Sequence, residues 1–94
     1  MNSARKFRKK PVVIEAWQLS KTNWRELEKW CGGSFIGNRV GGGDDDLDCL
    51  GLSLRTLEGP VFALIDDWII RGVGGEFYPC KPDIFAATYE DVPQ

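Results

Sequence analysis

Between Leu50 and Pro79 the sequence alternates short apolar runs with turn residues, which is the pattern of a small antiparallel sheet. Leu50, Leu52 and Leu54 alternate with other residues and are expected to share the buried face of one strand. Gly74-Gly75 predicts a two-residue hairpin turn of the kind that needs positive φ. The expected strands are residues 50–57, 61–65, 68–73 and 76–79.

The segment Pro11–Leu19 is rich in β-branched and aromatic residues and predicts a further strand with one apolar face. Residues 22–33 predict a short helix, with Asn23 as its N-cap and Glu26 reaching back in a capping box. Gly32 is the expected left-handed residue at its end. The apolar face of this helix fits a core position better than a stacking platform; it holds Trp24, Leu27, Trp30 and Cys31.

Residues 81–89 predict a second short helix, with Pro82 at its first position and Asp83 in its first turn. Its expected common face holds Ile84, Phe85, Thr88 and Tyr89. The predicted order is β-α-β-β-β-β-α, and a further short strand is compatible with residues 35–40. We therefore expect one α+β domain over residues 1–94, built as a small curved antiparallel sheet or half-barrel with two short helices.

Charge is distributed unevenly along the 94 residues. Five of the twelve basic residues lie in the first ten positions, so the remaining 84 residues hold seven basic and fourteen acidic groups, a formal charge of −7. An acidic body argues against broad nucleic-acid binding. The basic start fits a solvated terminus that folds back as a strand, or an arm that meets a small anion, a partner or its own body.

Other features of the composition bear on compartment and partners. There is no apolar run of membrane-spanning length, and the basic start lacks the apolar region of a signal peptide. Three cysteines without a CxxC pair favour reduced thiols in a cytosol over a disulfide framework. A chain this short has a thin core, so self-association into a homo-oligomer would add burial.

Several catalytic and metal-binding arrangements are missing from the sequence. Without histidine, neither a Ser-His-Asp triad nor a Cys-His dyad can form, and the cysteines match no zinc spacing. The aspartates at 44–46 and 48 depart from the EF-hand pattern and fit a solvated loop. No phosphate-binding GxxxxGK[ST] loop occurs. We therefore expect no cofactor and no metal, although a hydrolase using Asp66, Asp67 or Glu76 stays open.

Binding chemistry gathers on the predicted hairpin near the end of the chain. Aromatic rings beside cationic groups can stack on a nucleobase and hold a phosphate. The candidate ligand-binding residues, including two on the basic start, are Arg8, Lys9, Trp68, Arg71, Glu76, Tyr78 and Lys81. The alternative is structural: Trp68 and Phe77 enter the core while the charged residues pair at the surface.

Cys80 lies between Tyr78-Pro79 and Lys81, just before the second predicted helix. Lys81 and the helix N-terminus would both lower the thiol pKa and make Cys80 reactive. The interpretation that we favour is nevertheless a small buried hydrophobe, with the reactive thiol as the alternative.

The two ends of the chain resemble a family of small, mostly uncharacterised phage and prophage proteins. Residues 7–16 (FRKKPVVIEA) are similar to that family's opening strand, and residues 67–85 (DWIIRGVGGEFYPCKPDIF) to its closing hairpin and helix. Residues 30–33 (WCGG) are a weaker link. The chain has Asp66 where the pattern usually has Pro or Gly, and Ala86 where it often has Glu. The family supplies no established catalytic residues.

The resemblance implies a phage accessory protein that acts in the cytoplasm of a host bacterium. Phage proteins of this size often counter host defence, so the first hypothesis is a non-catalytic sponge for a phosphate-bearing, nucleotide-derived immune signal. The second hypothesis is an inhibitor that binds a host protein directly through a flat patch with aromatic anchors. The third is a nucleotide hydrolase that works without histidine.

Overall fold

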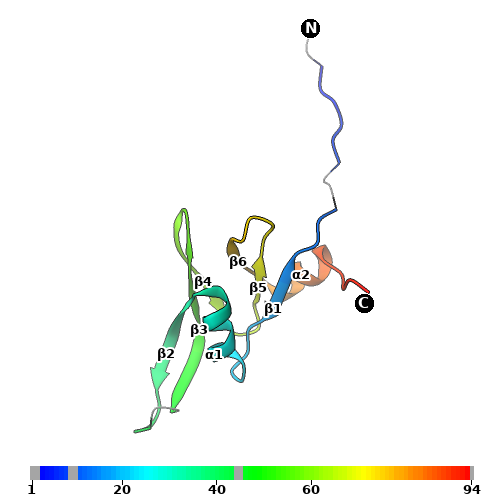
Figure 1. Ribbon diagram of the computed structural model, residues 1–94. Coiled ribbons are helices and arrows are strands. Elements are labelled where there is room, and N and C mark those ends of the chain that lie inside the picture. The colour runs from blue at the N-terminus through cyan, green and yellow to red at the C-terminus, as the bar shows by residue number, and fades with distance from the viewer. Residues whose placement is uncertain (1–2, 9–10, 44–45, 94) are drawn as a thin grey trace.

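A computed structural model describes residues 3–8, 11–43 and 46–93 of the chain. Within them the elements are β1 (Glu15–Gln18), α1 (Trp24–Cys31), β2 (Ser34–Arg39), β3 (Leu47–Thr56), β4 (Gly59–Leu64), β5 (Trp68–Arg71), β6 (Phe77–Cys80) and α2 (Pro82–Thr88). The expected α+β class is confirmed. The strands, however, divide into two antiparallel three-stranded sheets, β1-β5-β6 and β2-β3-β4, which do not close into a barrel (Figure 1).

The turn between β4 and β5 carries the chain from one sheet to the other. Asp66 takes a left-handed conformation there, with φ of 78°, and Asp67 is buried. The Leu19 amide donates to the Asp67 carbonyl at 2.9 Å, and the Asp66 amide donates to the Leu19 carbonyl at 2.8 Å. These bonds fix the end of the β1 segment against the turn, and the Asp67 amide donates to the Leu64 carbonyl of β4 at 2.9 Å, so the turn is tied to both sheets.

A single cluster of buried side chains joins both sheets to α1. Leu27 and Trp24 of α1 are buried, which confirms the predicted apolar face of this helix. Trp30 lies at the edge of the cluster and contacts both Trp17 and Phe77, with ring centroids 5.7 and 5.0 Å apart. The buried members of the cluster are Leu19, Trp24, Leu27, Cys49, Leu52, Leu54, Ala63 and Ile69.

Because of a β-bulge, the buried positions of β3 differ from the predicted ones. Leu52 and Leu54 are buried as expected, but Leu50 is 46% exposed. The partners of Gly51 and Cys49 on β2 are the consecutive residues Ile36 and Gly37, so Leu50 is an extra residue without a partner. One inserted residue reverses the side-chain alternation on its N-terminal side, which is why Cys49 is buried in place of Leu50.

The β5–β6 loop is longer than the predicted two-residue turn. The Gly72 amide donates to the Glu76 carbonyl at 2.8 Å, and the Gly75 amide donates to the Gly72 carbonyl at 2.9 Å. The loop is therefore Val73–Gly75, and only Gly75 has positive φ, at 84°. A three-residue loop that ends in a left-handed glycine is the next most common hairpin connection.

The first strand and first helix also differ from their predicted forms. Pairing of β1 with β5 begins at Glu15, so residues 11–14 of the predicted strand lie outside the sheet. Asn23 does not cap α1 with its side chain; its Oδ1 accepts from the Ser20 amide and its Nδ2 donates to the Gln18 carbonyl, both at 2.8 Å. Because Asn23 holds the preceding turn, the predicted capping box with Glu26 does not form. Gly32 ends the helix left-handed, as predicted.

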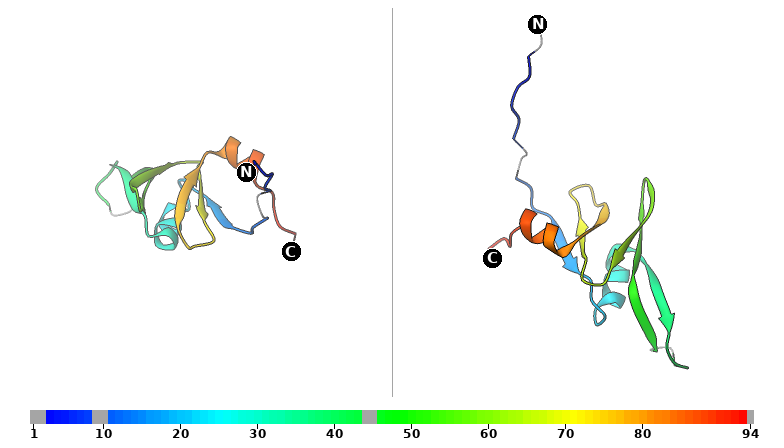
Figure 2. Two further views of the ribbon diagram at one scale, coloured as in Figure 1. Left: turned by 90° about the horizontal axis from the view of Figure 1, so that it is seen from above. Right: turned by 180° about the vertical axis from the view of Figure 1, so that it is seen from behind.

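Residues 3–8 extend away from the sheets as an exposed arm (Figures 1 and 2). The expected return of the basic start as a strand is therefore wrong for these residues. This arm accounts for much of the long dimension of the molecule, whose extents are 69 × 33 × 21 Å.

Candidate functional site

The ligand-binding residues predicted on the β5–β6 hairpin lie on both faces of its sheet. Trp68 and Tyr78 share one face with Ile70, because Ile70 pairs with Tyr78 and side chains alternate along a strand. Arg71 points to the other face, where its Nη1 lies 3.3 Å from Oε1 of Glu15. The hairpin therefore separates the predicted aromatic groups from the predicted guanidinium.

The remaining predicted residues also have separate surroundings. Lys81 Nζ lies 3.2 Å from both carboxylate oxygens of the buried Asp67, and the Glu76 carboxylate lies directly over Gly72 in the hairpin loop. Arg8 lies on the extended arm, and Lys9 lies outside the described residues. The six predicted residues that the structure describes thus do not form one site, and two of their cations, Arg71 and Lys81, are paired with carboxylates of this chain.

An open groove of about 720 Å³ runs between the β3–β4 turn and β6, and we call it the hairpin groove. Glu76 and Tyr78, from the predicted set, border it together with residues that the sequence did not single out. Its lining is Arg55, Thr56, Leu57, Glu58, Val61, Glu76, Phe77, Tyr78 and Pro79. Most of this surface is apolar, and its charged groups are Arg55 near the end of β3, Glu58 in the β3–β4 turn and Glu76 just before β6.

Arg55 is the cationic group of the hairpin groove. It is exposed, and within the described part of the chain its guanidinium has no hydrogen-bond or ion-pair partner. The hydroxyl of Thr56, the next residue, already has two partners within the chain: it donates to the Gly59 carbonyl and accepts from the Glu58 amide. Arg55 therefore remains available to a ligand, whereas Arg71 and Lys81 are paired.

Tyr78 borders the groove from the α2 side of β6. Burial raises the pKa of its phenol to about 12, and the neighbouring Tyr89 hydroxyl adds to the shift. Tyr78 is consequently a neutral hydrogen-bonding group at physiological pH, and it does not act as a phenolate there.

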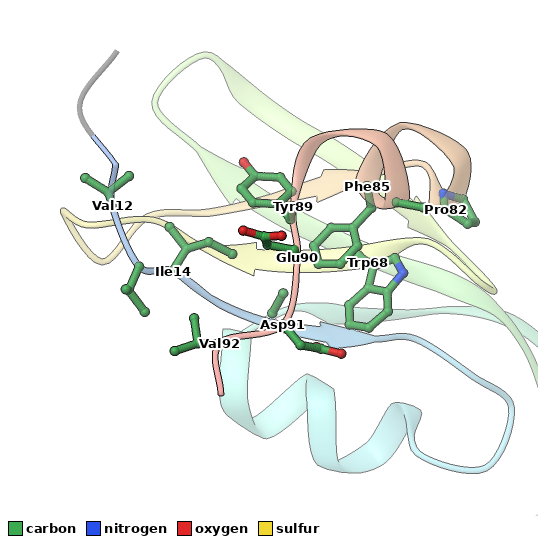
Figure 3. A pocket seen from close by; sticks show the side chains of 12 residues that line it. Val12, Ile14, Trp68, Pro82, Phe85, Tyr89, Glu90, Asp91 and Val92 are labelled. Atoms are coloured by element: carbon green, nitrogen blue, oxygen red, sulfur yellow. The ribbon is translucent and has the colours of Figure 1, made fainter. Parts of the chain in front are cut away.

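A second concavity of about 670 Å³, the helix pocket, lies between α2, the segment 12–16 and the residues after α2 (Figure 3). Three of its rings form a stack: Trp68 and Phe85 have centroids 4.1 Å apart at 5°, and Phe85 and Tyr89 are 5.0 Å apart. Glu90 and Asp91 line the pocket beside the stack. Trp68 thus belongs to this acidic, aromatic pocket and not to the hairpin groove.

The three cysteines are free. Burial raises the pKa of the Cys80 thiol, and Asp67 and Asp83 add to the shift. The predicted lowering of this pKa by Lys81 is therefore wrong, because Lys81 is paired with Asp67. Within residues 3–8, 11–43 and 46–93, no three Cys, Asp or Glu side chains gather as a metal site. No helix in the same ranges is long and apolar enough to cross a membrane.

No protein-family model matches the chain, and no curated protein or solved structure matches it either. The geometry of the two concavities is therefore the basis of the functional argument. The sequence offered one signal for the hairpin groove: Arg55 is a cation that follows the alternating leucines of a strand, two residues before the Leu57-Glu58-Gly59 turn.

Proposed function

We propose that this protein is a non-catalytic binding protein that sequesters a small, nucleotide-derived ligand in the hairpin groove. The observation that carries the proposal is that Arg55, whose guanidinium has no hydrogen-bond or ion-pair partner among the described residues, lines a largely apolar groove of about 720 Å³. That volume lies within the roughly 300–1,000 Å³ typical of small-molecule sites.

The groups around the groove support this class of ligand. Phe77, Val61 and Pro79 offer an apolar surface to a base, and the Arg55 guanidinium can fork onto a phosphate. The carboxylates of Glu58 and Glu76 can accept hydrogen bonds from the amino groups of a base. A ligand with one planar ring system and one exposed anionic group would satisfy these groups together.

The resemblance to small phage proteins supplies the biological setting of the proposal. In that setting the protein acts in the host bacterial cytoplasm as an anti-defence sponge, and it lowers the free concentration of an immune signal. A sponge needs stoichiometric binding with slow release and no turnover, so affinity is the property that selection would act on.

Native mass spectrometry with cyclic dinucleotides and cyclic ADP-ribose isomers tests the proposal. We expect one compound to be retained and to be released intact on denaturation. Arg55→Ala should raise its dissociation constant at least about tenfold, equivalent to about 1.4 kcal/mol. Arg39→Ala is the matched control, because Arg39 is also an exposed arginine, donates to the Gly43 carbonyl and does not line the hairpin groove.

Each contrary outcome of this experiment has a distinct meaning. Loss of binding in Arg71→Ala, with Arg55→Ala unaffected, would move the site to the β1–β5 side of the sheet, where Arg71 lies beside Glu15. Release of a converted product would identify an enzyme and overturn the non-catalytic proposal. Failure of every compound to bind would overturn the choice of ligand class.

A second candidate function, direct inhibition of a host protein, is favoured by the outer face of the β2-β3-β4 sheet. Phe62 and Leu64 alternate on the outside of β4 and are 61% and 49% exposed, and the bulged Leu50 is 46% exposed. Exposed apolar clusters of this kind mark protein-binding surfaces. Capture of one stoichiometric host protein, abolished by Phe62→Ser but retained by Arg55→Ala, would establish this function instead.

A further inference from the structure

The extended arm presents exposed aromatic and cationic side chains. Its described residues Arg5, Lys6, Phe7 and Arg8 are exposed, and the Phe7 ring is 82% exposed. The Arg5 guanidinium lies 5.4 Å from the centroid of that ring, so the arm presents an aromatic group beside cations. An aromatic side chain with this exposure, on a segment separate from the core, favours burial against another surface.

The helix pocket offers the complementary chemistry. Its floor is the Trp68–Phe85–Tyr89 stack, and its sides include Val12 and Ile14 (Figure 3). Glu90 and Asp91 add two carboxylates, and neither has an ion-pair partner among residues 3–8, 11–43 and 46–93. An aromatic floor beside free carboxylates suits an aromatic residue flanked by basic ones.

We propose that the arm of one copy of this protein docks in the helix pocket of a second copy. Phe7 of the partner's arm packs on the aromatic stack, and its flanking basic residues pair with Glu90 and Asp91. The charges of the two parts support this occupant, because the first ten residues carry five basic groups and the other 84 carry a formal charge of −7.

The reach of the arm fits an exchange between two copies. The arm points away from its own body, and its own pocket begins at Val12, one residue beyond Pro11 (Figures 1 and 2). Three residues lie between Phe7 and Pro11, so their Cα atoms are at most about 14 Å apart in an extended chain. A two-fold axis near Pro11 would therefore let each arm enter the other copy's pocket, and the interface would be symmetric and closed.

Sedimentation velocity over a range of protein concentrations tests the proposal. We expect the full chain to form dimers, and a variant lacking residues 2–8 to stay monomeric at the same concentrations. Phe7→Ser should weaken the dimer at least about tenfold. Val73→Ser is the matched control, because Val73 is also an exposed apolar residue, at 75%, but lies in the β5–β6 loop, outside the helix pocket. Far-UV circular dichroism shows that each variant remains folded.

A mixing experiment separates exchange of arms from every other mode of association. The variant without residues 2–8 keeps an open pocket, and Ala86→Trp keeps the arm but fills the pocket that Ala86 lines. We expect each variant alone to be monomeric and the two together to form a heterodimer through one arm and one pocket. Since ion pairs contribute, raising the salt concentration should weaken this heterodimer.

Three results would overturn the proposal. A full chain that stays monomeric at every concentration would show that the arm has no second copy as partner. Dimers that survive removal of residues 2–8 would place the interface elsewhere. Equal weakening by Phe7→Ser and Val73→Ser would show that the helix pocket is not the docking surface. None of these results depends on ligand binding in the hairpin groove, so the two proposals can fail separately.

Discussion

Asp66 and Asp67 are neighbours in the sequence, yet their environments differ completely. The Asp67 carboxylate is buried, accepts from the Leu64 amide at 2.9 Å and pairs with Lys81. The Asp66 side chain is exposed, while its backbone takes a left-handed conformation that costs an L-residue roughly 1–2 kcal/mol. One aspartate therefore stabilises the turn between the sheets, and the other is strained in it.

Substitution of these two residues should have opposite effects on stability. Asp67→Ala removes the acceptor of the Leu64 amide and the partner of Lys81, so we expect the free energy of unfolding to fall by about 2 kcal/mol. Asp66→Gly relieves the left-handed strain and should leave this free energy unchanged or raise it by up to about 1 kcal/mol. Urea denaturation measures both. Equal losses in the two variants would contradict this assignment of roles.

The raised pKa of Tyr78 makes stability depend on alkaline pH. The folded state holds the phenolic proton up to about pH 12, whereas the ordinary pKa of a tyrosine is 10. The contribution of the neutral phenol to the free energy of unfolding is therefore fully present below pH 10. It should be lost as the pH rises from 10 to 12. We expect the melting temperature to fall more steeply through this window for the native chain than for Tyr78→Phe. Parallel curves would show that this phenol is not shielded.

At the scale of elements, the close approach of β3 and β4 depends on one glycine. A Cβ on Gly51 would clash with the backbone carbonyl of Ala63 on the neighbouring strand. Gly51 also follows the bulged Leu50, so the small residue and the irregular pairing occur together where β3 bends.

Gly51→Ala should therefore destabilise the protein by more than 1 kcal/mol, since a backbone carbonyl must move to admit the methyl group. Gly42→Ala is the control, because a Cβ there meets no atom within 4 Å and φ lies outside the positive range. We expect the control to change the melting temperature little. A similar loss for both variants would mean that the contact with Ala63 does not set the cost of Gly51→Ala.

At the scale of the whole molecule, the two sheets depend on one shared core. Leu19 and Ile69 belong to the β1-β5-β6 side, Leu52 and Leu54 to β3, and all are buried in the cluster that includes Leu27 of α1. Trp30 adds ring contacts from α1 to β1 and β6. Because neither sheet has a separate core of comparable size, we expect them to unfold together.

Trp30→Ala should lower the free energy of unfolding by about 2–3 kcal/mol, since it removes the ring contacts of Trp30 with Trp17 and Phe77, which join α1 to the β1-β5-β6 sheet. Leu57→Ala should change it by less than about 0.5 kcal/mol, because Leu57 is fully exposed. Denaturation followed by far-UV circular dichroism should give one transition in both variants. Two separate transitions in Trp30→Ala would show that the sheets are independent.

The sequence by itself determined the α+β class, the antiparallel strands, the buried face of α1 and the place of Pro82 at the start of α2. These features follow from local periodicity and from turn or capping chemistry, which act over a few residues and can be read along the chain. The same local rules failed for Leu50, because a single unpaired residue in β3 reverses the alternation on which the prediction rests.

Only the tertiary structure decided how the strands divide into two sheets and which charged groups stay free. Arg71 pairs with Glu15, 56 positions away, and Lys81 pairs with Asp67 across a hairpin, so both lose the role that their sequence neighbours suggested. Arg55 gains a candidate role because the β3–β4 turn meets β6, a contact between distant segments. Interactions of this kind depend on which segments pack together, and local sequence patterns do not encode that choice.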